Sequence, residues 1–479
     1  MKRNDILENI KVEKLVFWGK GFARLESTEK WERGRVLFIT GWAIPGSVVN
    51  LRVIKKKKDF AECQIIEIIE KSPIEVKHKN NPYWECGGCK WINIPYAEQL
   101  KIKQNQVEES FFHLKKYQEN FNFQDIIPSP LVDWYRNKVE FSFGKYISHK
   151  EDVMEHFNVW FHKQGSFSQI QDTDGCVLID QIQNDIYKEI KDFSKTLGLP
   201  VYDQKTQKWF FRHIMIRRAF FTDEIMLLLS FNPDYSFEWN LKLKIEEIKT
   251  FLNKLTEKYT EIKSIYFSHN TNKADVCIWD LELIFGKKTI DEKLLGLTFE
   301  ISPQSFFQTN SYWAEKLYSE ILKLATDKSG TVLDLYGWTG TIWMIFADNW
   351  ATKVHSVELM TSSSKDWEKN ALKNGITNMT FVNKKVEDFL GWFLDSGEKA
   401  NLLIIDPPRA WMHPKALPNI LKFKTNQMIY VSCNPATLSR DLDFILQNSD
   451  YEIETVIPVD MFPHTHHIET IVSLKLKKS

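Results

Sequence analysis

Hydrophobic positions from residue 289 to the end alternate between strand spacing and helix spacing. Short apolar runs rich in β-branched residues are separated by longer stretches with helical periodicity. In chain order the runs are TVLDLY, KVHSVEL, MTFV, NLLIIDPP, QMIYVSC, ETVIPVDMF and IETIVSLKL. This alternation predicts a doubly wound, mainly parallel α/β sheet, in which ligands bind at the carboxyl ends of the strands.

The chain before residue 289 follows two other patterns. Residues 1–72 carry short runs of β-branched and aromatic residues divided by turn-forming residues, which predicts a small β-barrel. Residues 73–288 mix strand-like runs with an amphipathic helix and predict a central α+β domain. The apolar face of that helix comprises Leu243, Ile245, Ile248, Phe251, Leu252 and Leu255. We therefore expect three domains, at 1–72, 73–288 and 289–479.

Charge and hydropathy limit the possible partners. The formal net charge is zero, so a polyanionic partner would have to bind a local basic patch. The lysines at 55–58 form such a patch on the predicted barrel, although a solvated strand end has the same composition. No apolar run approaches the ~18 residues that span a bilayer, and the N-terminus shows no signal-peptide core. We expect a cytoplasmic protein without a membrane partner.

Acidic residues end three of the predicted parallel strands. Asp334 ends the first, Glu358 follows 24 residues later at the end of the second, and Asp406 ends the strand before two prolines. Acids often end strands simply as turn formers. Three together, beside a loop with Gly337 and Gly340 but no full dinucleotide motif, fit S-adenosylmethionine better than a nicotinamide nucleotide, since there is no pyrophosphate to hold.

Two further residues suggest covalent catalysis. Cys433 follows a buried strand in a turn, a position that favours a nucleophile over a buried apolar thiol, and Glu469 follows the segment DMFPHTHHIE. The three histidines of that segment do not have the spacing of a common zinc site. A thiolate that adds to C6 of a pyrimidine makes C5 nucleophilic enough to accept a methyl group, and a carboxylate can then remove the C5 proton.

The motifs together resemble the 5-methyluridine RNA methyltransferases, in particular the branch that acts on 23S rRNA and carries an N-terminal TRAM domain. The resemblance covers nearly the whole chain and is carried by YRNKVEFSF, SPQSFFQTN, DLYGWTGTI, DPPR, YVSCNPATLSRDL and MFPHTHHIE. It implies a TRAM/OB-like barrel that binds RNA, a central domain that helps to hold the RNA, and a Rossmann-like methyltransferase domain. It also implies a monomer that methylates uridine C5 in structured RNA, with rRNA favoured over tRNA.

The resemblance also assigns roles to individual residues. Cys433 would be the nucleophile and Glu469 the base, and the contacts to S-adenosylmethionine would be made by Gln308, Tyr336, Glu358 and Asp406. Many family members hold a [4Fe-4S] cluster through four cysteines. Three positions match, namely Cys86, Cys89 and Cys176, but Asn80 occupies the first, where thiolate ligation is expected. A zinc site or a turn without metal is the alternative.

Tryptophan is unusually abundant where the family pattern has glycine or another small residue. The chain has 17 tryptophans and 19 glycines, and glycine falls below its usual share of about 7%. The suspect positions are Trp18, Trp42, Trp160, Trp338, Trp343, Trp367 and Trp411, whereas aromatic residues at 91 and 134 are unremarkable. We hypothesise that the gene uses UGA for glycine, so that the native protein has glycine at these positions.

Two other interpretations stay open. An amino-group methyltransferase also has a strand-terminal acid followed by two prolines, but its chemistry needs no nucleophilic cysteine. An RNA-binding or assembly protein could keep this fold without the activity, and obstructed glycine loops would be the evidence for it.

Overall fold

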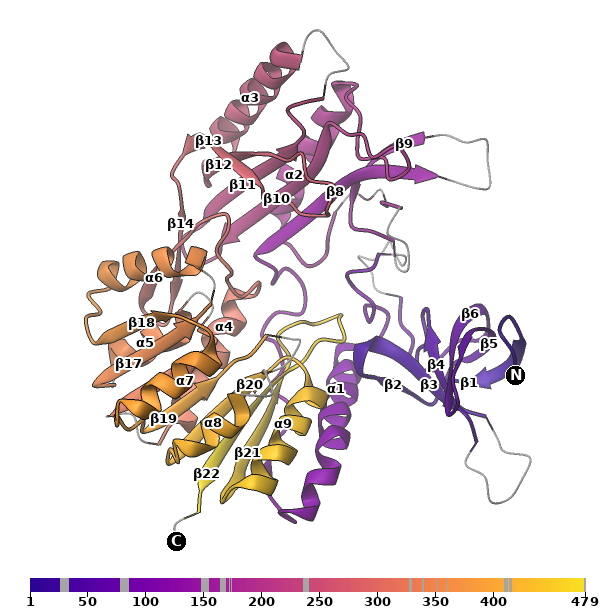
Figure 1. Cartoon of the computed structure of the whole chain (residues 1–479). Coiled ribbons are helices and arrows are strands. Elements are labelled where there is room, and N and C mark those ends of the chain that lie inside the picture. Colours follow the sequence, from indigo (N-terminus) through magenta and orange to yellow (C-terminus); the bar gives the residue numbers. More distant parts are fainter. Residues whose placement is uncertain are drawn as a thin grey trace.

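The three groups of elements in Figure 1 are seen in a computed structural model of the chain. The structure describes residues 1–25, 34–77, 86–147, 155–163, 169–171, 173, 175–235, 241–326, 330–337, 340–349, 351–359, 361–408, 412 and 416–477. No helix within these ranges is both long and apolar enough to cross a membrane.

The N-terminal group is a six-stranded sheet that surrounds a small apolar core, as the pattern of residues 1–72 predicts. Its strand order is β1-β5-β6-β4-β3-β2. The strands are β1 (Ile6–Lys11), β2 (Lys14–Val16), β3 (Lys20–Arg24), β4 (Val36–Thr40), β5 (Val48–Lys56) and β6 (Phe60–Glu70), with a 3-10 turn, η1 (Phe17–Gly19), between β2 and β3. The lysines at 55–58 are exposed where β5 turns into β6.

The central group is a second six-stranded sheet, with the order β13-β12-β11-β10-β8-β9. Its elements are β8 (Lys138–Ile147), β9 (Glu155–Trp160), α2 (Gln181–Thr196), β10 (Phe211–Ala219), β11 (Glu224–Phe231), α3 (Leu241–Lys258), β12 (Ile262–His269) and β13 (Asp280–Gly286). Both helices contribute to one core with the sheet. The predicted apolar face of α3 is buried at Ile248, Leu252 and Leu255. Leu243 is 67% exposed, because it lies about 200° around the helix from Leu241, which packs on the core.

The C-terminal group is an eight-stranded sheet with the order β18-β17-β16-β19-β20-β22-β21-β7. Strands β16 to β20 are parallel, and β22 lies antiparallel between β20 and β21. The predicted strands are β16 (Thr331–Leu335), β17 (Lys353–Glu358), β18 (Met379–Asn383), β19 (Leu402–Ile405), β20 (Gln427–Ser432), β21 (Tyr451–Val459) and β22 (Glu469–Leu476). The predicted doubly wound α/β sheet is therefore confirmed.

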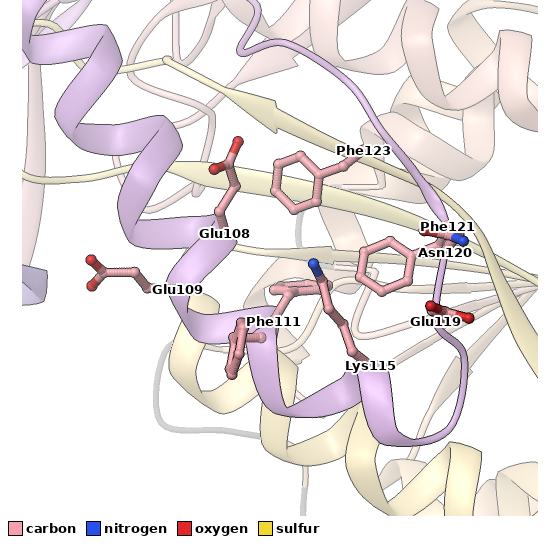
Figure 2. Close-up of a pocket in the computed structure, with 9 residues that line it drawn as sticks. Glu108, Glu109, Phe111, Lys115, Glu119, Asn120, Phe121 and Phe123 are labelled. Carbon is pink, nitrogen blue, oxygen red and sulfur yellow. The ribbon is translucent and has the colours of Figure 1, made fainter.

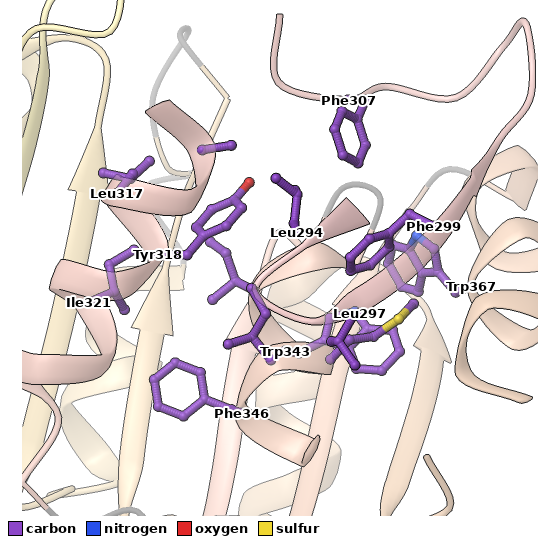
Figure 3. Packing of buried hydrophobic residues seen from close by; sticks show 14 of the residues in the cluster. Leu294, Leu297, Phe299, Phe307, Leu317, Tyr318, Ile321, Trp343, Phe346 and Trp367 are labelled. Carbon is purple, nitrogen blue, oxygen red and sulfur yellow. The ribbon is translucent and has the colours of Figure 1, made fainter. Parts of the chain in front are cut away.

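Helices cover both faces of this sheet, as strand and helix alternate along the chain. They are α4 (Ser311–Leu324), α5 (Thr341–Asn349), α6 (Thr361–Lys373), α7 (Val386–Asp395), α8 (Ala416–Lys422) and α9 (Pro435–Asn448). A hairpin of β14 (Ile290–Leu294) and β15 (Leu297–Ile301) precedes them. In the core of Figure 3, Trp343 of α5 and Trp367 of α6 are both fully buried, with ring centroids 5.9 Å apart.

One early segment belongs spatially to the last sheet. Helix α1 (Tyr96–Phe111) and the 3-10 turn η2 (Phe112–Lys116) contribute Val107, Phe111 and Leu114 to the core of the C-terminal group. Strand β7 (Asn122–Phe123) then pairs in parallel with β21. The predicted domain boundaries stay a prediction, and residues 96–123 link the first and last parts of the chain.

Candidate active site

Strand pairing brings the predicted nucleophile and base together. Strands β20 and β22 run antiparallel, and their register pairs Ser432 with Thr470. Continuing the register by one residue sets Cys433 opposite Glu469. Cys433 is half-buried and Glu469 is 7% exposed. Both predicted catalytic residues therefore lie at the same end of adjacent strands.

The start of helix α9 fixes the turn that carries Cys433. Asn434 is the N-cap, and its side-chain oxygen accepts hydrogen bonds from the backbone N–H groups of Ala436 and Thr437 at 3.1 and 3.4 Å. Pro435 occupies the first helical turn, where a missing N–H costs nothing. The sequence CNPAT thus ends the strand and begins the helix within one residue of the thiol.

A buried ion pair holds the segment that leads to Glu469. Lys103 of α1 donates to the Asp460 carboxylate at 2.6 Å and to the Phe462 carbonyl at 3.1 Å, and both charged side chains are fully buried. His464 follows in the same segment: its N–H donates to Gln99 at 2.7 Å, and its Nε2 lies 2.9 Å from Asp133. The segment is thereby tied to α1 and to the chain that leads into β8.

Strand-terminal acids gather at the neighbouring strands. Asp334 at the end of β16 is 1% exposed, and burial, together with the charges of Asp406 and Glu358, holds its carboxyl pKa well above the usual range. Burial raises the pKa of Asp406 to about 7. The strand order reverses at β16, which makes this edge the switch point where α/β sheets bind ligands.

Three of the four predicted cofactor contacts line one cleft. Gln308, Tyr336 and Asp406 share it, whereas Glu358 lies outside its lining and accepts a hydrogen bond from the Leu359 N–H at 2.8 Å. The other lining residues are Phe306, Tyr318, Gly337, Thr341 and Ile342.

Tyr318 is a site residue that the sequence did not reveal. It lies in α4, and its hydroxyl accepts a hydrogen bond from the Thr341 hydroxyl at 2.9 Å. Burial raises the pKa of Tyr318, and the charges of Asp406, Asp334 and Glu469 raise it further. Tyr318 therefore stands within electrostatic reach of both the strand-terminal acids and the catalytic base. Nothing in the helical stretch SYWAEKLY distinguishes it from a core aromatic residue.

The cleft has suitable polar groups for an S-adenosyl ligand but little space. It encloses about 10 Å³, roughly the room that one water molecule needs. The first loop is tight: Tyr336 has a φ of 68°, and Gly340 has a φ of 80°. A Cβ atom at Gly340 would lie 2.5 Å from the indole nitrogen of Trp343. The donor set fits the cofactor, and the enclosed space is smaller than the cofactor.

One suspect tryptophan, Trp18, occupies a position that suits glycine, whereas Trp343 and Trp367 lie within helices α5 and α6. Trp18 has a φ of 75°, which is rare for a bulky side chain. The indole N–H groups of Trp343 and Trp367 are buried without a hydrogen-bond partner in the part of the chain that the structure describes. Trp42 is half-buried and Trp160 stacks on Phe141 in the central core.

Two other suspect tryptophans, Trp338 and Trp411, lie outside the described residues. Trp134, which the sequence did not single out, also has a positive φ, of 59°, and is 53% exposed. Like Trp18, it occupies a position where glycine would relieve strain in the backbone.

The three predicted metal-binding cysteines lie near one another in the central core. Cys89 and Cys176 are buried, and Cys86 packs against the same cluster. Burial raises the pKa of the Cys89 thiol well above its usual value, and the proximity of Cys176 and Cys86 raises it further. Asn80 lies outside the described residues, and the residues within them form no group of three or more ligands suited to a metal. Three thiols do not fit the four-thiolate ligation of a [4Fe-4S] cluster.

A larger cavity, of about 560 Å³, lies away from these residues (Figure 2). It is lined by aromatic side chains of α1, η2 and the segment leading to β7, and by Glu108 and Glu119. Figure 2 shows Lys115 reaching between Phe111 and Phe121. None of the predicted catalytic or cofactor residues borders it.

Comparison with known proteins places the chain in a family. The model of the tRNA (uracil-5-)-methyltransferase family matches residues 96–477. An uncharacterized RNA methyltransferase of Caldanaerobacter subterraneus is 33% identical and covers 98% of this chain and 99% of its own length. One of Clostridium tetani is 37% identical and covers 91% of each chain. The chain therefore belongs to the tRNA (uracil-5-)-methyltransferase family and is an RNA (uracil-5-)-methyltransferase, as the motifs indicated.

A solved structure has the same fold. The Pyrococcus abyssi tRNA (uracil-54, C5)-methyltransferase, in complex with S-adenosyl-L-homocysteine, superposes with a TM-score of 0.72 at 24% identity. The alignment covers 98% of this chain and 99% of that chain. The arrangement of an N-terminal sheet, a central sheet and a methyltransferase sheet is thus shared along the whole length.

Proposed function

We propose that the protein methylates C5 of a uridine in structured RNA, with S-adenosylmethionine as the methyl donor and Cys433 as a covalent catalyst. The observation that supports this proposal is the register of β20 and β22, which pairs Ser432 with Thr470, the residues next to Cys433 and Glu469. The charges of Asp406, Asp334 and Glu469 all act on Tyr318. A thiol and a carboxylate at one sheet edge supply the nucleophile and the base that C5 methylation needs.

The chain's own groups account for each proton and bond of the uridine reaction. The Cys433 thiolate adds to C6, and the electron pair of the C5–C6 double bond moves toward C5. Bound S-adenosylmethionine would supply the methyl group: C5 bonds to the methyl carbon as its bond to the sulfonium sulfur breaks, and S-adenosylhomocysteine is the leaving group. The Glu469 carboxylate then takes the C5 proton, the double bond re-forms, and the cysteine leaves as a thiolate.

The cofactor roles follow from the cleft. Gln308, Tyr336 and Asp406 line it and would hold S-adenosylmethionine, while Glu358, at the end of β17, would meet the ribose hydroxyls. The target base must leave its stack, because C5 and C6 are reached from defined directions. The iron–sulfur cluster that the resemblance implies is not part of this proposal, since only three of the predicted positions carry cysteine.

We favour 23S rRNA over tRNA as the substrate, on the resemblance of the N-terminal sheet and of the Cys86–Cys89 turn to the rRNA branch. That the enzyme acts as a monomer in the cytoplasm is part of the same proposal. A second candidate is an RNA-binding protein of this fold that has lost activity. The small volume of the donor cleft above Trp343 favours it.

Trapping with 5-fluorouridine RNA tests the proposal. Fluorine at C5 cannot leave as a proton, so the Cys433 adduct persists and migrates with the RNA on a denaturing gel. The unaltered chain and a Trp338→Gly/Trp343→Gly variant are each incubated with labelled S-adenosylmethionine and with 23S rRNA or tRNA transcripts. We expect an adduct with rRNA that Cys433→Ala abolishes and that Cys63→Ala, which removes a buried thiol of the N-terminal core, leaves intact.

Three results would contradict parts of the proposal. Full methylation by Cys433→Ala would exclude the covalent mechanism. An adduct with tRNA alone would reverse the choice of substrate. RNA binding without an adduct in both proteins would establish the inactive binding protein instead.

A further inference from the structure

A second cavity lies in the central domain, away from the catalytic residues. It encloses about 260 Å³ and is bordered by β8, by the start of β10, and by the loops around residues 162, 202 and 273. Its polar lining includes Arg212, His162, Lys273 and Asp275. The methyltransferase chemistry uses none of these residues.

A β-bulge places Arg212 against this cavity, with His213 beside it in the chain. The register of β10 against β11 pairs Phe211 with Phe231 but His213 with Ser230, so Arg212 is the extra residue. Phe211 stays in the central core, while Arg212 and His213 both lie within 3.4 Å of Asp275. Bulges of this kind redirect side chains next to functional sites.

The Arg212 guanidinium is held in place before any ligand arrives. It lies 3.4 Å from the ring centroid of Tyr202 and 5.4 Å from that of Trp209, and its side chain is 4% exposed. One Nη donates to the Ala274 carbonyl at 3.3 Å, and the Nε is buried without a partner among the described residues. A stacked, partly unsatisfied guanidinium is a preorganised donor for phosphate oxygens.

The other groups leave the cavity with excess positive charge. Asp275 is ionised at pH 7, because His162, whose Nε2 lies 3.5 Å away, and the charge of Arg212 lower the pKa of its carboxyl to about 2. His213 is neutral at pH 7, since burial lowers its pKa to about 4. The two positive charges of Arg212 and the exposed Lys273 therefore exceed the single negative charge of Asp275.

The cavity lies on the sheet face that leads to the methyltransferase domain. His213, Met215 and Arg217 alternate along β10, and Met215 packs in the core of the methyltransferase side. Arg217 donates to the carbonyls of Ser302 and Ser305 at 3.1 and 2.9 Å, just before the cofactor cleft begins at Phe306. At about 3.3 Å per residue, His213, which follows the cavity-lining Arg212, lies about 13 Å along the strand from Arg217.

We propose that this cavity binds a phosphodiester group of the substrate RNA, through Arg212 and Lys273, on the strand that approaches the catalytic pocket. The proposal rests on the proposed function, because it takes RNA as the ligand. It makes the central sheet a second point of attachment that holds the RNA while the target base is extruded.

Salt-dependent RNA binding tests it with the full-length chain and a labelled oligouridylate. Each phosphate contact on a single strand adds about 0.7 to the slope of log affinity against log salt concentration. We expect Lys273→Ala to lower the slope by about that amount without changing the melting temperature. The matched control is Lys254→Ala, which removes an exposed lysine on α3 from the other face of the sheet. Arg212→Lys, which keeps the charge but loses the planar fork, should weaken binding with little change in slope.

The proposal is overturned if Lys273→Ala and Arg212→Lys both bind the oligouridylate as the unaltered chain does. It is also overturned if inorganic phosphate, at constant ionic strength, raises the melting temperature while both variants keep normal RNA binding, because the cavity would then serve free phosphate. If the unaltered chain forms the Cys433 adduct but Lys273→Ala keeps the full salt slope, the role of this cavity is refuted and the proposed function is not. If the unaltered chain forms no adduct, the proposed function is refuted. The measurement of RNA binding does not depend on adduct formation.

Discussion

Two loops at one edge of the C-terminal sheet are built in opposite ways. The segment from Asp460 to Glu469 is held by a fully buried ion pair and by hydrogen bonds with α1 and with residues 133–135. The loop after Asp334 depends on backbone conformations that favour glycine, and a buried indole lies beneath it. The segment that carries the proposed base is thus held by long-range contacts, whereas the proposed cofactor loop depends on local space.

This difference explains why the two loops respond differently to substitution. A loop fixed by many distant partners tolerates a change of one surface residue, and it fails when a buried charge loses its partner. A loop that depends on glycine has no comparable set of distant partners, and one added side chain fills the space that the ligand needs. The following predictions test each half in turn.

The largest effect is expected at the base. Glu469→Gln keeps the shape of the side chain but cannot take the C5 proton, so turnover should fall about 10²- to 10⁴-fold. The adduct with ordinary uridine RNA should accumulate, because methylation still occurs and release does not. Denaturing gels measure the adduct, and Glu454→Gln, on the neighbouring strand β21, is the control. Normal turnover in Glu469→Gln would assign the proton transfer to another group.

The buried ion pair should matter most for stability. Lys103→Met leaves the Asp460 carboxylate buried without its partner, and we expect a loss of about 3–5 kcal/mol in the free energy of unfolding. Urea denaturation measures it. The double variant Lys103→Met/Asp460→Leu should recover much of the loss, and Lys101→Met, on the exposed side of α1, should change little. An equal loss in the single and double variants would mean that packing, not charge, holds the segment.

Replacing tryptophan with glycine should have opposite effects at two exposed positions. Trp18→Gly relieves a left-handed backbone conformation, so we expect a gain of about 1 kcal/mol in the free energy of unfolding. Trp392→Gly removes an equally exposed tryptophan from the middle of α7, where glycine costs about 1 kcal/mol. Chemical denaturation compares the two. Mass spectrometry of the native protein reads the residue at each suspect position, and tryptophan at 338 would refute the codon hypothesis.

The smallest effect concerns the pH dependence of stability without cofactor. Burial raises the pKa of Asp406 to about 7, so the folded state binds a proton that the unfolded state releases near pH 4. The free energy of unfolding should therefore fall as the pH rises from about 4 to about 7. Asp406→Asn should flatten this part of the profile, as measured by urea midpoints at each pH. An unchanged profile would mean that Asp406 is well solvated in the folded protein.

The sequence predicted the strands well because their periods and end residues are local signals. The strand-terminal acids and the thiol follow from residue type and position, and the family resemblance added Gln308 and Tyr336. Sequence alone could not place Tyr318, since a tyrosine within a helix looks the same in a core and in a site. Nor could it show that α1 packs against the last sheet, because that contact joins residues more than 300 positions apart.

The antiparallel insertion of β22 has a consequence for synthesis of the chain. Strand β22 follows β21 in the sequence, yet it lies between β20 and β21 and carries Glu469 as its first residue. During translation, β21 and the early strand β7 therefore cannot pair with the rest of their sheet until β22 has left the ribosome. A nascent chain can hold a finished N-terminal sheet and still lack an active site, so premature termination should yield folded fragments without catalytic power.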